Sequence, residues 1–93
     1  MALCKEILLP NGTIGNYHII GEIVRLDYER KVCNIIVASY SSKESFENGD
    51  EIVDRNKEAY NEEDFTFIET EDIEPQLYNK LIEKGLFKDA TKC

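Results

Sequence analysis

Two neighbouring segments, residues 17–28 and 32–40, are apolar on both faces when they are read as β-strands, and this constrains the fold most. Side chains alternate between the two faces of a strand. In the first segment, one face carries Ile20, Val24 and Leu26, and the other carries Tyr17, Ile19 and Ile23. In the second segment, one face carries Ile36, Ala38 and Tyr40, and the other carries Cys33, Ile35 and Val37. A sheet with one face in water carries polar residues on that face. Both faces of these strands are therefore expected to be covered.

The first half of the chain predicts a β-meander. Residues 5–9 are a short apolar run that stops at Pro10, and residues 11–16 have the composition of a turn. The two apolar strands follow, joined by a polar tip at residues 29–31. Gly21 in the first of them is expected to mark a bulge or a point of close backbone approach. Together these segments give about three antiparallel strands.

The middle of the chain is less regular. Residues 41–50 are polar and predict a mobile loop with Phe46 as its single apolar anchor. Residues 52–60 fit a strand, a helix or a loop, whereas residues 65–68 are short and β-like.

One helix is predicted near the C-terminus, at about residues 73–84. Asp72 or Glu74 can cap its start, Pro75 suits its first turn, and Gly85 suits the position just after its end. Its apolar stripe is Ile73, Leu77, Tyr78, Leu81 and Ile82. The apolar pair Leu86 and Phe87, just after the helix, is expected to fold back so that both side chains are buried. The predicted fold is α+β: one domain over residues 1–93, with a small antiparallel β-meander and one C-terminal helix.

A helix of this length covers only one face of such a sheet, so the other face needs a second cover. The sheet can close on itself as a sandwich or partial barrel, or the free face can be an interface with another subunit. Burying a few more Ile and Val side chains at about 1.5–3 kcal/mol each can hold an assembly together. The interface candidates are Tyr17, Ile19, Ile23, Ile35 and Val37.

Charge and composition exclude several classes of function. The net charge is −8, and residues 58–79 contain eight acids with no Lys or Arg. Because this stretch repels phosphate and no basic cluster offsets it, nucleic-acid binding is not expected. No membrane span or signal peptide is recognisable, so the protein is expected to stay in the compartment where it is made.

No catalytic, cofactor-binding or metal-binding constellation is recognisable. His18 is the only histidine, lies within the strongest strand and is expected to be structural. The acidic stretch lacks the spacing of a calcium loop. Three cysteines in an unexported chain predict reduced thiols, with Cys33 in the core and Cys4 and Cys93 near the ends, where exposed thiols can form adventitious disulfides.

Several short motifs resemble small proteins of tailed bacteriophages and prophages. They are Ile7-Leu8-Leu9-x-Asn11-Gly12, Tyr17-His18-x-Ile20, Val37-Ala38-Ser39-Tyr40-x-Ser42-Lys43, Tyr78-x-x-Leu81 and Phe87-Lys88-Asp89-Ala90-Thr91. The resemblance spans nearly the whole chain and implies a virion-associated part, such as one of the tail or baseplate, with no catalytic residues to carry over. The expected location is then the virion or the host cytoplasm. Residues 44–46 depart from the pattern, which has a basic residue just after Lys43.

Two functions are expected from these observations. The first is a non-enzymatic phage structural or accessory protein that self-associates or docks on a larger protein assembly. The alternative is an acidic inhibitor that occupies a basic surface of a host protein, as a nucleic-acid mimic does. The mimic requires residues 58–74 to form an exposed, rigid negative ridge.

Overall fold

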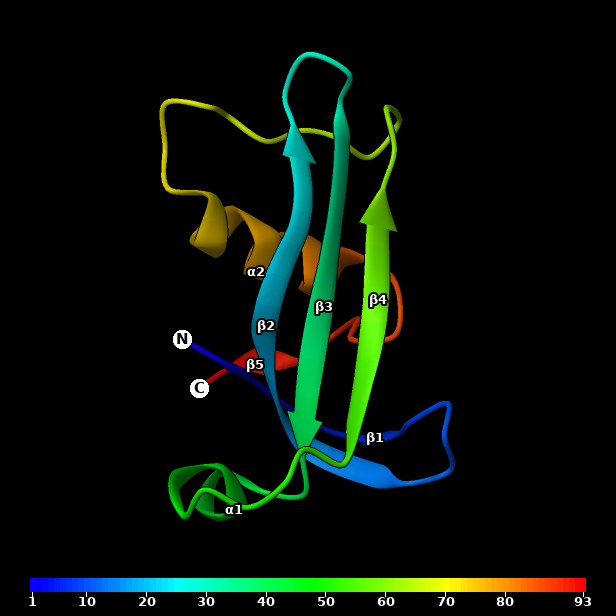
Figure 1. The fold of residues 1–93 in the computed structure, drawn as a ribbon, viewed down its shortest axis with the longest axis vertical. Coiled ribbons are helices and arrows are strands. Elements are labelled where there is room, and N and C mark those ends of the chain that lie inside the picture. Colours follow the sequence, from blue (N-terminus) through cyan, green and yellow to red (C-terminus); the bar gives the residue numbers. More distant parts are fainter.

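The computed structural model describes residues 1–93 and shows a five-stranded antiparallel sheet with two helices (Figure 1). The elements in chain order are β1 (Leu3–Leu8), β2 (Ile14–Asp27), β3 (Val32–Tyr40), α1 (Lys43–Glu47), β4 (Asp54–Tyr60), α2 (Ile73–Glu83) and β5 (Thr91–Lys92). The predicted α+β class and the strand over residues 32–40 are confirmed.

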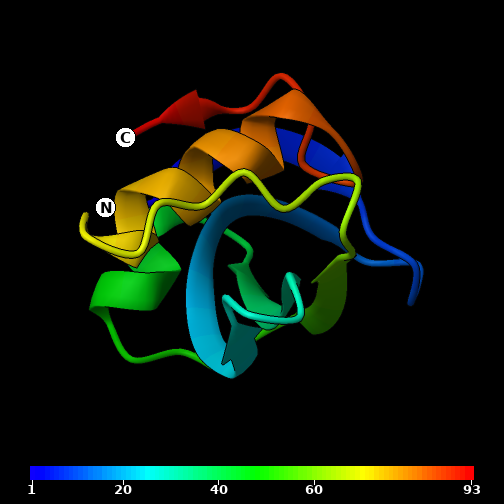
Figure 2. The same ribbon diagram turned by 90° about the horizontal axis from the view of Figure 1, so that it is seen from above.

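The long strand β2 organises the sheet, whose strand order is β4-β3-β2-β1-β5. Its first residues pair with β1, and the rest pair with β3 as far as Asp27. The strand is strongly curved, so the hairpin of β1 and β2 turns away from the plane of β3 and β4 (Figures 1 and 2). The loop of this hairpin reaches β4, because the side-chain amide of Asn11 donates to the carbonyl of Val53 at 2.8 Å.

Helix α2 and the C-terminal tail lie on one side of this curved sheet (Figure 2). We call the face of β2, β3 and β4 that is turned toward α2 the inner face, and the opposite one the outer face. The core between the inner face and α2 consists of Leu3, Ile7, Leu9, Cys33, Ile35, Val37, Tyr60, Phe67, Leu77, Tyr78, Leu81, Phe87 and Ala90.

Two ambiguous segments are resolved by the structure. Residues 54–60 form β4, an edge strand that pairs with β3 along its whole length. The β-like residues 65–68 are not a strand, and this expectation was wrong. Phe67 enters the core from a loop, and the backbone N–H and C=O of Ile68 bond to the side chain of Gln76 at 2.7 and 3.1 Å. A side chain thus satisfies the polar groups that a neighbouring strand would otherwise satisfy.

The polar segment after β3 was expected to be a mobile loop, and instead it contains the short helix α1. The hydroxyl of Ser42 caps this helix by accepting from the backbone N–H of Ser45 at 3.0 Å. Phe46 is the apolar anchor, as expected, because its ring packs on Tyr17 and Tyr40 with centroid distances of 5.3 and 5.0 Å.

The ends of α2 are close to those predicted. Asp72, one of the two expected caps, occupies the N-cap position, but its side chain makes no capping bond. Gln76 supplies the local bonds instead, donating to the backbone carbonyls of Glu71 and Asp72 at 3.3 and 3.0 Å. Gly85 follows the helix with φ of +91°, the left-handed conformation that favours glycine.

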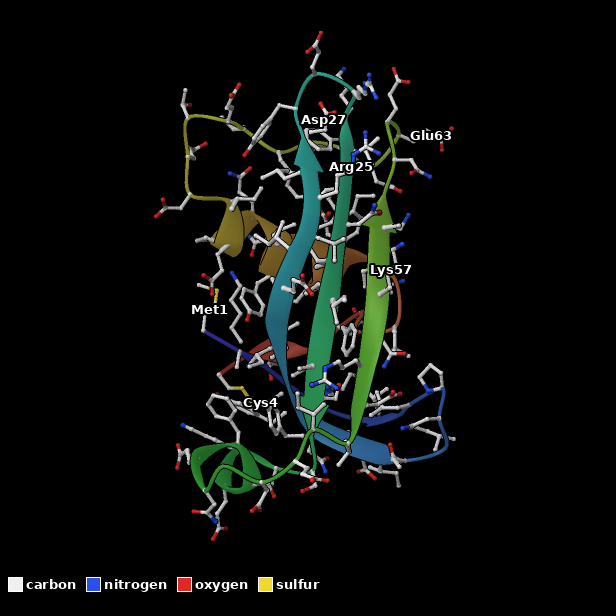
Figure 3. The ribbon with its side chains drawn as sticks, viewed as in Figure 1. Met1, Cys4, Arg25, Asp27, Lys57 and Glu63 are labelled. Atoms are coloured by element: carbon white, nitrogen blue, oxygen red, sulfur yellow. A yellow bond between two sulfur atoms is a disulfide. The ribbon has the colours of Figure 1, made fainter.

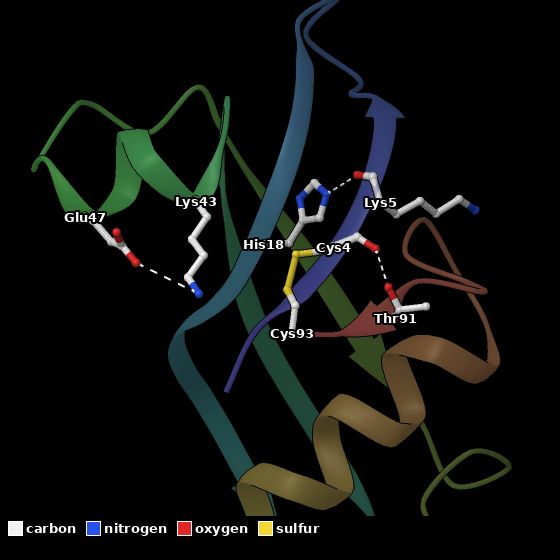
Figure 4. Close-up of a disulfide and its surroundings, with 7 residues drawn as sticks. All are labelled: Cys4, Lys5, His18, Lys43, Glu47, Thr91 and Cys93. Atoms are coloured by element: carbon white, nitrogen blue, oxygen red, sulfur yellow. Dashed lines mark hydrogen bonds and ion pairs between the residues drawn. A yellow bond between two sulfur atoms is a disulfide. The ribbon is translucent and has the colours of Figure 1, made fainter.

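The C-terminal tail folds back as expected, and Phe87 is completely buried. It ends in β5, which pairs with β1, and a disulfide joins Cys4 to Cys93 across 89 residues of sequence (Figure 4). The expectation of three reduced thiols was therefore wrong for this pair. It holds for Cys33, a free and buried thiol. Pairing of β1 with β5 brings the two ends together, and the spacing of the cysteines gave no sign of this.

Candidate interaction surface on the outer face of the sheet

The outer face is built from rows of residues that lie side by side on β2, β3 and β4. Directly paired residues in antiparallel strands point to the same face. One row is Ile19, Ala38 and Arg55, the next is Glu22, Ile36 and Lys57, and the third is Arg25, Asn34 and Ala59. Figure 3 shows this face toward the viewer, with Arg25 and Lys57 labelled. Its centre is apolar, and α2 lies behind the sheet.

A hollow of about 320 Å³ opens on this face. The residues that line it are Ile19, Gly21, Glu22, Ile36, Ala38, Tyr40, Ile52 and Arg55. Gly21 is the extra residue of an irregularity in β2, between the paired residues Ile20 and Glu22. A Cβ atom at Gly21 would lie 3.5 Å from that of Ala38, an ordinary contact. The backbone therefore tolerates a larger residue here, and glycine keeps the hollow open.

The charges around the hollow are arranged with opposite signs on opposite sides. Glu22 lies on β2, whereas Arg55 and Lys57 lie on β4, and all three side chains are exposed. Arg25 forms an ion pair of 3.5 Å with Asp27 on its own strand. The outer face thus combines an apolar centre with Glu22 on its β2 side and Arg55 and Lys57 on its β4 side, although the whole chain has a net charge of −8.

The structure divides the predicted interface residues among three environments. Ile35 and Val37 are completely buried beneath α2, so they belong to the core and line no surface. Tyr17 is also buried, because Phe46 of α1 covers it. The strand alternation was right for β3, but it could not show which of the two apolar faces the helix would cover.

Ile19 and Ile23 remain accessible, but they do not share a face. Ile19 pairs with Ala38 on the outer face, whereas Ile23 pairs with the buried Ile35 and is 40% exposed at the free edge of β2. Two irregularities in β2, after Ile20 and after Ile23, break the period of two. The first confirms the bulge expected at Gly21, whereas the second was not predicted. Ile36, Ala38 and Ile52 line the outer-face hollow but were not among the predicted interface residues, although Ile36 and the buried Ala38 stood together on one predicted face.

His18 is completely buried and holds a hydrogen-bond network (Figure 4). Its Nε2 lies 2.9 Å from the carbonyl oxygen of Lys5, and its Nδ1 lies 2.7 Å from the hydroxyl of Ser39. Because a carbonyl only accepts, Nε2 carries the hydrogen and Nδ1 accepts from Ser39. Burial lowers the pKa of His18, and the bond to Lys5 opposes this more weakly.

The pairing of Ser39 with His18 was not anticipated, because it depends on the register of β2 and β3. A serine beside a histidine is a nucleophile–base pair only where substrate can reach it. Both residues are completely buried, and none of the surface hollows is lined by either. The geometry assigns the pair to the core, where it joins β1, β2 and β3.

We expect His18 to make the folded protein sensitive to mild acid. Its pKa is lowered in the folded state from 6.5, so the unfolded chain takes up the proton first. The free energy of unfolding is therefore unaffected by His18 above pH 6.5, and it decreases as the pH drops from there toward the folded-state pKa. Urea denaturation of the wild type at about pH 7.5 and 5.5 should show this loss. The His18→Gln variant should lack it, and an equal loss in that variant would contradict the assignment.

The acidic stretch is only partly available to a partner. Glu58 accepts from the backbone N–H of Leu86 at 3.4 Å, and burial raises its pKa. Asp64 forms an ion pair of 2.8 Å with Lys84. The other acids of the stretch are exposed, namely Glu62, Glu63, Glu69, Glu71, Asp72 and Glu74. The loop that carries most of them is held at its C-terminal end by the bonds of Gln76.

The structure contains no group of three or more His, Cys, Asp or Glu side chains placed to hold a metal ion. No helix has the length and apolar character needed to cross a membrane. Comparison with protein-family models, with curated proteins and with solved structures found no match to this chain.

Proposed function

We propose that this protein is a non-enzymatic subunit that works by protein–protein association through the outer face of its sheet. The observation that carries the proposal is the hollow lined by Ile19, Ile36 and Ala38, on the face that α2 leaves uncovered. Apolar pockets with charged surroundings accept the anchor side chains of protein partners. The motifs that resemble phage proteins support a role as a structural or accessory part of a virion.

The hollow predicts that the wild-type protein associates and that a charge placed in the hollow prevents this. Gly21→Glu sets a carboxylate among apolar side chains without straining the backbone. Desolvation of this carboxylate should raise the dissociation constant about tenfold, which corresponds to ~1.4 kcal/mol. Sedimentation velocity from about 10 to 500 μM covers the range of weak interfaces.

Leu8→Glu is the matched control, because it adds the same charge at a side chain that is 70% exposed and lies outside the hollow. It should associate like the wild type, and all three proteins should melt at similar temperatures. A wild type that stays monomeric over the whole range of protein concentrations contradicts the proposal. So does equal weakening by Leu8→Glu, which would show that net charge alone is responsible.

A second candidate is the acidic inhibitor of a basic protein surface. The bonds of Gln76 favour it, because they fix the position of part of the exposed acidic loop. The engagement of Glu58 and Asp64 within the fold weighs against a continuous ridge. Binding of this kind falls steeply as salt rises, whereas burial of the apolar hollow does not.

A further inference from the structure

We propose that the partner on the outer face is a second copy of this chain, related by a two-fold axis that runs along β3. This inference rests on the proposed function and specifies its partner and geometry. It follows from the row of Glu22, Ile36 and Lys57, in which an acid and a base lie on opposite sides of an apolar residue at the same level of the sheet.

A two-fold axis along β3 places β2 of one copy over β4 of the other. Ile36 then meets Ile36 of the other copy near the axis, and Glu22 faces Lys57 of the other copy on both sides. The surface is therefore complementary to itself, as a two-fold interface requires. An axis across the strands would instead place β2 over β2 and bring Glu22 toward Glu22.

The size of the face predicts a weak dimer. Three strands about 4.8 Å apart, with about 3.3 Å for each residue along β3, give a face of roughly 400 Å². A standard interface buries about 800 Å² on each partner. We therefore expect a dissociation constant on the order of tens of micromolar, which makes the dimer sensitive to single charge changes.

Charge exchange between Glu22 and Lys57 tests this geometry. Each single variant, Glu22→Lys or Lys57→Glu, creates two like-charge contacts in its own dimer. Each should dimerise about tenfold more weakly than the wild type, and the double variant should recover wild-type affinity. An equal mixture of the two single variants should also recover it, because both contacts of the mixed dimer then join opposite charges.

Glu6→Lys and Lys31→Glu are the matched controls, since they change the net charge equally at exposed positions outside the face. Sedimentation equilibrium of the single variants, the mixture and the controls gives the dissociation constants. Recovery in the mixture, with both controls near wild type, supports the two-fold geometry. If the wild type associates and Gly21→Glu does not, but the mixture stays monomeric, the geometry is overturned and the proposed function stands. A wild type that never associates overturns both.

Discussion

Ile35→Ala is expected to destabilise the protein by about 2–5 kcal/mol, whereas Ile36→Ala should cost less than about 1.5 kcal/mol. These neighbours on β3 point to opposite faces. Ile35 is completely buried beneath α2, and its truncation leaves a cavity in the core. Ile36 is only partly buried, beside a hollow that is already open to water. Urea denaturation of both variants at pH 7.5 or above, where His18 does not contribute, gives the two free energies.

The same pair separates folding from association. Ile36→Ala should weaken dimerisation while it leaves the monomer nearly as stable as the wild type, and so the pair is best compared at low protein concentration. Equal losses of stability for the two variants would show that the outer face is covered within the single chain. That outcome would remove the physical basis for an interaction surface there.

Removing the disulfide should destabilise the protein about as much as Ile35→Ala does. The double variant Cys4→Ser/Cys93→Ser opens a loop with 89 residues of sequence separation. Loss of a native disulfide typically costs about 2–5 kcal/mol, and the chain entropy of so long a loop places the expected loss near the upper end of that range. For a domain of this length, that lowers the melting temperature by roughly 10 °C or more. The change should be clear in thermal unfolding followed by circular dichroism.

A thiol reductant provides the control for the disulfide variant. It should lower the melting temperature of the wild type toward that of the double variant and leave the double variant unchanged. The tail should loosen first, because the disulfide anchors its end at Cys93. The nearby contact between Phe87 and His18, whose ring centroids lie 5.0 Å apart, should weaken with it. If reductant leaves wild-type stability unchanged, the bond contributes nothing to the fold.

Local sequence signals were sufficient to predict β3 and α2, whereas β4 stayed ambiguous and neither α1 nor β5 was predicted. A β-branched, apolar run fixed β3 at its observed ends, and helical spacing of apolar residues with Gly85 at the end fixed α2. These are local properties, because the period of apolar residues and the backbone freedom of glycine act over a few neighbours. The surplus of apolar strand surface was also visible, and part of it remains uncovered on the outer face.

Which apolar face of the sheet becomes the core and which becomes the surface depends on tertiary packing. The alternation in β3 is symmetric between Ile35 and Ile36, and the choice depends on the side to which α2 packs. In β2, irregularities after Ile20 and Ile23 shift the alternation. Gly21 indicated the first of them in the sequence, whereas no residue indicated the second. The contacts of Cys4 with Cys93 and of His18 with Ser39 likewise join residues far apart in the chain, so they depend on strand pairing rather than on local sequence.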